Sequence, residues 1–154
     1  MSRYSSLVVD IGGTNMRYAY ANKNGISEES ILSNISDQKI NKTLSNLLSN
    51  PKIKNTVIAA AGPRLGNRIE MTNRKVIIDG DLLGRKFKLA NSQVLNDWEA
   101  VGHAIDEMKL KKIKKGKSKS NVDLMIGPGT GLGSSMEKSY QQRLETQNFI
   151  ANYF

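Results

Sequence analysis

The chain has 154 residues, of which 38% are hydrophobic and 24% charged, a balance typical of a folded globular protein. It contains no cysteine, which excludes disulfides and thiolate metal sites. No apolar run approaches the roughly 20 residues that a membrane-spanning helix requires, and residues 1–6 lack the apolar core of a signal peptide. We therefore expect a soluble, cytoplasmic protein with no membrane contact.

The net charge of +9 is concentrated in one segment. Seven lysines lie within residues 109–119, and without them the net charge falls from +9 to +2. No aromatic residue alternates with these lysines, so the segment lacks the side chains that stack on nucleic-acid bases. We interpret it as a solvated basic loop and do not expect a nucleic-acid partner. A patch that binds phosphate or nucleic acid is the alternative.

Strand and helix patterns alternate along the chain. Short apolar runs bounded by glycine, proline or asparagine predict strands, and apolar residues three or four positions apart predict helices. In chain order we expect strands at 5–10, 16–21 and 25–33, a helix at 36–50, strands at 56–61, 68–72 and 75–78, a helix at 79–87, a strand at 92–96, a helix at 97–108 and a strand at 121–126. The alternation predicts an α/β fold.

The basic segment marks a boundary between two domains. We expect a first domain at residues 1–108 and a basic linker at residues 109–120. Residues 121–154 then form the start of a second domain. The first two strands form a β-hairpin over the tight turn Gly12-Gly13.

The turn of residues 10–15 (DIGGTN) is a candidate phosphate site. Adjacent glycines let the backbone approach an anion closely and direct N–H groups at its oxygens. Asp10, at the strand end, can hold a water molecule of a magnesium shell, because Mg²⁺ prefers oxygen ligands and keeps several waters. An ordinary hairpin turn is the structural alternative, and this segment alone does not separate the two.

A second glycine-rich turn lies at residues 127–133 (GPGTGLG). It is not a Walker A loop, since no Gly-Lys-Ser/Thr follows, and it lacks the third glycine of a dinucleotide fingerprint. A flexible turn after a strand can wrap a phosphate. A plain glycine-rich connector remains the alternative.

Asn96 and Asp97 stand where a predicted strand runs into a predicted helix. Asp97 is a natural helix N-cap, and that structural role alone would explain it. The functional interpretation makes Asp97 a general base, which accepts the proton of a substrate hydroxyl while its oxygen attacks a phosphoryl group. A base, a metal-organising carboxylate and amide-lined turns are the parts that phosphoryl transfer requires.

The order of these motifs resembles bacterial glucokinases, which belong to the hexokinase group of the actin-like ATPase fold. The resemblance spans residues 5–133. It rests on the segments DIGGTNMR at 10–17, AGP at 61–63, MTN at 71–73, NDWEAV at 96–101 and GTGLG at 129–133. It implies the N-terminal lobe of an actin-like (ribonuclease H-like) ATPase, with a mixed sheet and flanking helices, and the start of a second lobe. A related family of zinc-containing repressor-type sugar kinases is less similar, because its members usually carry a cysteine-rich motif.

The resemblance implies ATP-dependent phosphorylation of glucose at its 6-hydroxyl, the first step of glycolysis, with ATP and Mg²⁺ as cofactors. It implies that Asp97 is the catalytic base and that Asp10 holds Mg²⁺ through water. The phosphate-binding residues that it implies are Asp10, Gly12, Gly13, Thr14, Gly129, Thr130, Gly131 and Gly133. The sugar-binding residues that it implies are Asn96, Asp97, Thr72 and Asn73.

The chain departs from the family pattern after Gly133. Family members run to about twice this length and continue with a Glu-Gly-Gly-His segment, which is absent; His103 lies inside a predicted helix, where we expect a packing or surface role. Residues 134–154 do not continue the pattern and predict a marginal amphipathic helix around Leu144. We therefore expect a truncated product, with a frameshift near Gly133 or a stop codon, that is weakly active or inactive alone.

Two other interpretations follow from this departure. The alternative function is a non-catalytic fragment that binds sugar or phosphate and needs a separate C-terminal half. An incomplete second lobe would also expose an apolar sheet edge and face, which predicts a homo-oligomer or association with another chain.

Overall fold

The computed structural model describes residues 4–105, 108–109, 111, 113, 122–128 and 132–138. The chain divides into two units, one comprising Met1–Asp97 and the other Trp98–Asn152. The domain boundaries expected from the sequence stay a prediction. No helix among the described residues has the length and apolarity needed to cross a membrane.

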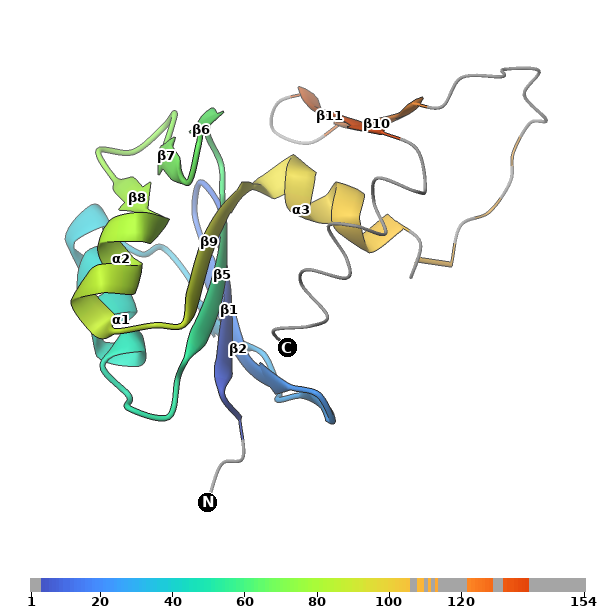
Figure 1. Cartoon of the computed structure of the whole chain (residues 1–154). Coiled ribbons are helices and arrows are strands. Elements are labelled where there is room, and N and C mark those ends of the chain that lie inside the picture. The colour runs from blue at the N-terminus through green and yellow to red at the C-terminus, as the bar shows by residue number, and fades with distance from the viewer. Residues whose placement is uncertain are drawn as a thin grey trace. The chain divides into compact units, whose positions relative to one another are not determined.

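The larger sheet of the first unit is mixed. Its central strand β1 (Ser6–Ile11) pairs antiparallel with β2 (Met16–Asn22) and parallel with β5 (Asn55–Ala60). β5 in turn pairs parallel with β9 (Asn91–Asn96), and the strand order is β3-β2-β1-β5-β9 (Figure 1). The hairpin of the first two strands and the α/β class are therefore as the sequence predicts.

The third strand expected at residues 25–33 forms two short strands instead. β3 (Gly25–Ile26) and β4 (Ser30–Leu32) both pair antiparallel with β2. Between them the Ser27 hydroxyl accepts the backbone N–H of Tyr20 at 2.9 Å. A side chain thus replaces the backbone partner at this point, and the ladder is interrupted.

Two helices cover one face of this sheet (Figure 1). In α1 (Asp37–Leu48), Ser36 is the N-cap and its side chain accepts from the N–H of Lys39 at 3.4 Å. In α2 (Gly80–Phe87), the N-cap Asp79 accepts from the N–H of Leu82 at 2.9 Å. Both helices are confirmed.

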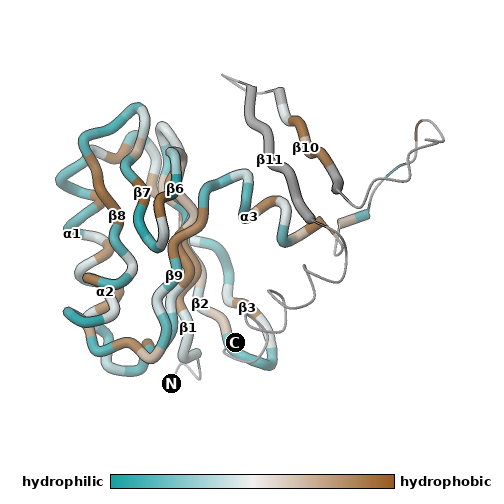
Figure 2. The backbone as a smooth tube through the Cα atoms, turned by 45° about the horizontal axis from the view of Figure 1, so that its top comes forward, coloured by the Kyte–Doolittle hydropathy of each residue, from teal (hydrophilic) through white to brown (hydrophobic). Residues whose placement is uncertain are grey.

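The core of the first unit lies between the sheet and these helices. Alternate residues of β1 point into it, and α1 contributes residues four positions apart. Figure 2 shows apolar stretches along strands such as β8 and β9, whereas α1 and α2 alternate between apolar and polar residues. The side chains of the core with the least exposure include Leu7, Ile11, Met16, Ile40, Leu48, Ile58, Ile69, Ile78, Val76 and Val94.

A small antiparallel sheet completes the first unit. It consists of β6 (Arg64–Leu65), β7 (Arg68–Glu70) and β8 (Ile77–Asp79). β6 was not expected; it pairs with β7 across Gly66, whose φ of +61° suits glycine.

The second unit contains α3 (Asp97–Ala104), whose first residue belongs to the first unit, and a hairpin of β10 (Val122–Pro128) and β11 (Leu132–Lys138). The helix is shorter than the expected 97–108, and Met108, beyond its end, is exposed. Residues 134–138 lie in β11. The helix expected around Leu144 lies outside the described residues, as does most of the basic segment.

Candidate functional site

The parallel strands of the larger sheet end at one edge. Ile11 of β1, Ala60 of β5 and Asn96 of β9 are register partners, so the segments that follow them begin side by side. These segments are the glycine turn of residues 12–15, Ala61-Gly62 and Asp97. The carboxyl ends of parallel strands are the usual position of ligand sites in α/β proteins. The structure therefore brings the first glycine turn and the Asn96-Asp97 pair to one edge.

Asp10 and Asp97 influence one another electrostatically at this edge. Burial raises the pKa of Asp10 above its ordinary value of 3.8, although its side chain keeps 45% exposure. The Arg17 guanidinium, 3.2 Å from the Asp10 carboxylate, opposes the rise in pKa. The negative charges of Asp97 and Glu29 add to it. Two carboxylates that repel each other beside solvent suit a hydrated cation, whose charge relieves the repulsion.

The glycine turn is open to solvent. Gly12 donates its N–H to the carbonyl of Asn15 at 2.9 Å, which closes the turn. Gly13 and Thr14 are exposed, and within the part of the chain that the structure describes their N–H groups have no hydrogen-bond partner. A Cβ placed on Gly13 would meet no atom within 4 Å, and the φ of Gly13 is not positive. The fold does not require glycine there, whereas close approach of an anion would.

Asn96 is held in place by a neighbouring strand end. Its Nδ2 donates to the carbonyl of Gly62 at 2.8 Å. A Cβ on Gly62 would overlap the carbonyl oxygen of Glu70, so the chain can pass here only as glycine. The AGP motif thus supports the Asn96 side chain through a close backbone contact.

Thr72 and Asn73 lie in the exposed loop between β7 and β8. The N–H of Thr72 donates to the carbonyl of Ala61 at 3.2 Å, which ties this loop to the end of β5. The loop expected to line a sugar cleft therefore begins beside the same sheet edge.

The second glycine-rich motif belongs to the other unit. Gly133 pairs with Gly127 across the β10–β11 hairpin. Gly129, Thr130 and Gly131 lie outside the described residues. A Cβ on Gly127 would overlap the Trp98 ring, so packing alone explains that glycine.

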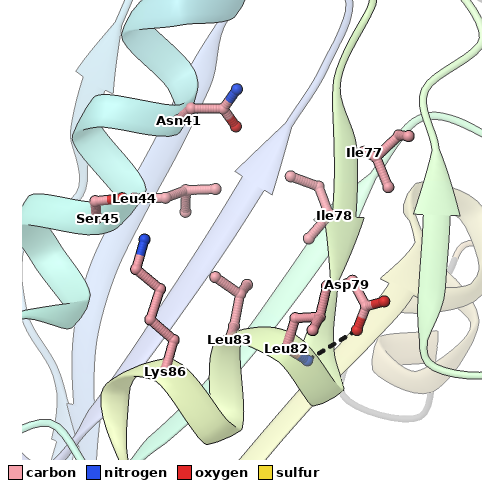
Figure 3. A pocket seen from close by; sticks show the side chains of 9 residues that line it. All are labelled: Asn41, Leu44, Ser45, Ile77, Ile78, Asp79, Leu82, Leu83 and Lys86. Atoms are coloured by element: carbon pink, nitrogen blue, oxygen red, sulfur yellow. Dashed lines mark hydrogen bonds between the residues drawn. The ribbon is translucent and has the colours of Figure 1, made fainter.

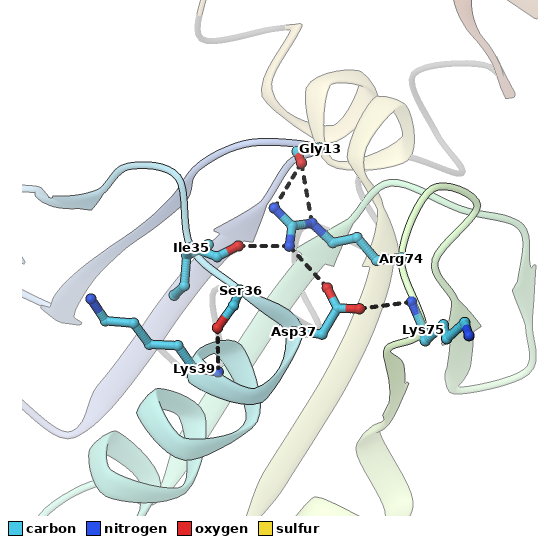
Figure 4. Close-up of polar contacts among 7 residues, drawn as sticks. All are labelled: Gly13, Ile35, Ser36, Asp37, Lys39, Arg74 and Lys75. Atoms are coloured by element: carbon cyan, nitrogen blue, oxygen red, sulfur yellow. Dashed lines mark hydrogen bonds and ion pairs between the residues drawn. The ribbon is translucent and has the colours of Figure 1, made fainter.

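Arg17 and Arg74 contact the candidate site and received no role from the sequence. Arg17 pairs with Asp10, its register partner on the neighbouring strand. Arg74 donates to the carbonyl of Gly13, 61 positions away along the chain (Figure 4). Its position directly after the MTN motif could have marked Arg74 as a residue near the site, but only the fold shows that its side chain reaches the carbonyl of Gly13.

A separate cavity of about 250 Å³ lies between α1, β8 and α2 (Figure 3). Leucine and isoleucine side chains such as Leu44, Ile78 and Leu83 form much of its wall, and Asn41, Ser45 and Lys86 supply polar atoms. None of the residues that the sequence predicts for the site lines it.

A mixed sheet with flanking helices is the architecture that this chain shares with sugar kinases of the actin-like ATPase fold. The chain belongs to the glucokinase family, whose family model matches residues 7–147. The matched range extends past Gly133 and includes most of the segment that we expect to depart from the family pattern.

Solved structures of sugar kinases share the fold. A glucokinase from an Antarctic psychrotroph is 26% identical, with a TM-score of 0.62 over 89% of this chain and 47% of its own. A glucokinase from Balamuthia mandrillaris in complex with glucose is 20% identical, with a TM-score of 0.64 over 88% of this chain and 45% of its own.

A ROK family protein from Streptococcus pneumoniae in complex with sucrose is 18% identical, with a TM-score of 0.59 over 87% of this chain and 46% of its own. The chain thus spans less than half the length of these relatives. No curated protein sequence matches it.

Proposed function

We propose that the chain is the N-terminal part of a glucokinase, which transfers the γ-phosphoryl group of ATP to the 6-hydroxyl of glucose in the cytoplasm as the first step of glycolysis. Membership of the glucokinase family supports the class of reaction. The observation that carries the proposal for this chain is the convergence of Asp97, Asp10 and the glycine turn at one sheet edge.

Asp97 is the catalytic base in this proposal. It is half-buried and follows β9 directly, so a rigid strand holds its backbone. From there its carboxylate accepts the proton of the sugar hydroxyl as the oxygen attacks phosphorus. Asn96, Thr72 and Asn73 bind the sugar at the same edge.

The glycine turn binds the phosphates of ATP. The N–H groups of the exposed residues Gly13 and Thr14 are anion donors, and the open space at Gly13 lets phosphate oxygens approach the backbone. Asp10 fits Mg²⁺ bound through water, because its carboxylate is half-exposed and feels the charge of Asp97. When bound, Mg²⁺ supplies positive charge to the phosphate oxygens.

The second lobe contributes the other phosphate contacts in this proposal. We assign residues 1–108 to the first lobe, 109–120 to the basic linker and 121–154 to the beginning of the second lobe. Gly129, Thr130, Gly131 and Gly133 then form the second phosphate turn.

The alternative function is a non-catalytic fragment that binds sugar or phosphate and needs a separate C-terminal half. One observation favours it. On β10 the side chains of Leu124 and Ile126 are 60% and 57% exposed, an apolar surface that another chain could cover.

A coupled assay for glucose 6-phosphate, with glucose binding measured by calorimetry in parallel, separates these functions. For the kinase, Asp97→Asn lowers turnover about 100-fold or more, the range of general-base catalysis. Glucose binding without turnover at any ATP concentration favours the fragment. Turnover that is unchanged in Asp97→Asn contradicts the assignment of the base.

A further inference from the structure

The guanidinium of Arg74 is nearly buried and joins separate segments of the first unit (Figure 4). Its side chain is 10% exposed. Nε and Nη2 both donate to the carbonyl oxygen of Gly13, at 3.2 and 2.7 Å. Nη1 donates to the carbonyl of Ile35 at 2.7 Å and to Oδ1 of Asp37 at 3.0 Å. Asp37 is itself fixed, because its Oδ2 accepts the N–H of Lys75 at 3.1 Å.

Two carbonyl groups of the glycine turn are held in this way. Arg74 holds the carbonyl of Gly13, and the N–H of Ile35 donates to the carbonyl of Thr14 at 3.3 Å. In a planar trans peptide the C=O and N–H bonds point in opposite directions, and the described residues contain no cis peptide. Holding the carbonyl of Gly13 therefore directs the N–H of Thr14 away from Arg74. Holding the carbonyl of Thr14 directs the N–H of Asn15 away from Ile35.

We propose that Arg74 is a positioning residue, which fixes the glycine turn so that its N–H groups face an incoming phosphate. This inference rests on the proposed function, in which that turn binds ATP. Arg74 acts through the backbone of the turn and not by contact with the nucleotide, because its fork is already engaged with three acceptors. Lysine cannot replace it fully, since an ammonium group lacks the planar, divergent donors that reach three acceptors together.

The contact also connects the two halves of the site. Arg74 directly follows Thr72 and Asn73, the proposed sugar loop, and it ends on the turn that is proposed to bind phosphate. One side chain thus sets the spacing between the sugar loop and the phosphate turn.

The test uses the full chain with Arg74→Met, Arg74→Lys and Arg85→Met. The last variant removes the same charge from an exposed position in the final turn of α2. Three quantities are measured: ¹⁵N relaxation of the amides of Gly13, Thr14 and Asn15, the affinity for ATP with Mg²⁺, and the affinity for glucose. Urea unfolding verifies that each variant is folded.

We expect Arg74→Met to increase the fast motion of the turn amides and to weaken ATP binding about tenfold or more, the effect of losing a charged hydrogen-bond donor. Glucose affinity and the Arg85→Met variant remain at the wild-type level, and Arg74→Lys is intermediate. If Arg74→Met does not fold, Arg74→Lys decides by the same readouts.

Two results would overturn the inference. One is a turn that stays as rigid in the folded Arg74 variant as in the wild type. The other is an equal loss of ATP and glucose affinity, which indicates a general structural effect. A wild-type chain that binds no ATP contradicts the proposed function instead, and the relaxation data then decide the role of Arg74 by themselves.

Discussion

At the scale of single residues, Gly13 and Gly62 lie at the same edge of the sheet for different reasons. Gly62 passes so close to the backbone of Glu70 that a Cβ would overlap it, whereas a Cβ on Gly13 would meet nothing within 4 Å. Packing therefore accounts for Gly62 but not for Gly13. We propose that a bound phosphate is the reason for the glycine at position 13.

This difference predicts opposite results for two alanine substitutions. Gly62→Ala lowers the free energy of unfolding by about 1–3 kcal/mol, the usual cost of forcing atoms into a packed site. Gly13→Ala leaves the free energy of unfolding unchanged but weakens ATP binding roughly tenfold, which corresponds to about 1.4 kcal/mol. Urea unfolding and calorimetry measure the two effects. If Gly13→Ala lowers the free energy of unfolding but leaves the affinity for ATP unchanged, the turn has only a structural role.

Asp10 predicts a pH dependence of magnesium binding. Burial, together with the charges of Asp97 and Glu29, raises its pKa above 3.8. The carboxyl therefore takes up a proton at a higher pH than an ordinary aspartate does, and Mg²⁺ competes with that proton. The affinity for ATP with Mg²⁺ falls as the pH is lowered through the raised pKa, and Asp10→Asn removes this dependence. A pH profile that is the same in Asp10→Asn and the wild type would contradict the assignment of Mg²⁺ to Asp10.

The raised pKa of Asp10 also affects stability, with the opposite dependence on pH: a low pH weakens Mg²⁺ binding but favours the folded state. Because folding favours the protonated form of Asp10, its contribution to stability is present below the unfolded-state pKa and is lost as the pH rises through the raised pKa.

At the scale of secondary-structure elements, α1 supports the glycine turn. Ile35 and Asp37 at its N-terminus accept hydrogen bonds from Arg74, and its buried residues join the core below the sheet. The position of the turn therefore depends on the packing of a helix that contributes no predicted site residue.

Substitution of Leu44 tests the packing of α1 in the core. This side chain is 3% exposed and packs in the core from the middle of α1. Leu44→Ala lowers the free energy of unfolding by about 2–5 kcal/mol, the range for a buried leucine. Lys42→Ala, at an exposed position of the same helix, serves as the control and stays within about 0.5 kcal/mol of the wild type. Urea unfolding measures both, and equal stabilities would contradict the core assigned here.

Local sequence patterns predicted most of these elements, but they did not predict contacts between residues that are far apart in the sequence. The apolar period predicted α1, and the alternation of strands and helices predicted the α/β class. The backbone N–H of Tyr20 donates to the Ser27 hydroxyl where the expected third strand is interrupted, and the apolar period of the sequence does not predict such a bond. The contact of Arg74 with Gly13 was equally invisible, because it joins segments that only folding brings together.

At the scale of the whole molecule, the hairpin of the second unit carries exposed apolar residues. On β10, Leu124 and Ile126 are two residues apart and are 60% and 57% exposed, so they share one face of the strand. An apolar surface of this kind favours association with a second chain.

We therefore expect the purified chain to associate, and Leu124→Thr with Ile126→Thr to reduce the association. Light scattering after size-exclusion chromatography measures the mass of both proteins. Val101→Thr, at an exposed apolar position of α3, is the control and leaves the mass unchanged. A wild-type chain that is monomeric at all concentrations would contradict this expectation.

In the proposed function, the glycine turn, Asp10, Asn96 and Asp97 form one site at the carboxyl edge of the sheet. An NMR titration of the ¹⁵N-labelled chain, first with glucose and then with a non-hydrolysable ATP analogue and Mg²⁺, tests it most directly. We predict that glucose shifts the amides of Thr72, Asn96 and Asp97 and that the nucleotide shifts those of Gly13 and Thr14. Shifts confined to the cavity between α1 and α2, or none at saturating ligand, would contradict the claim.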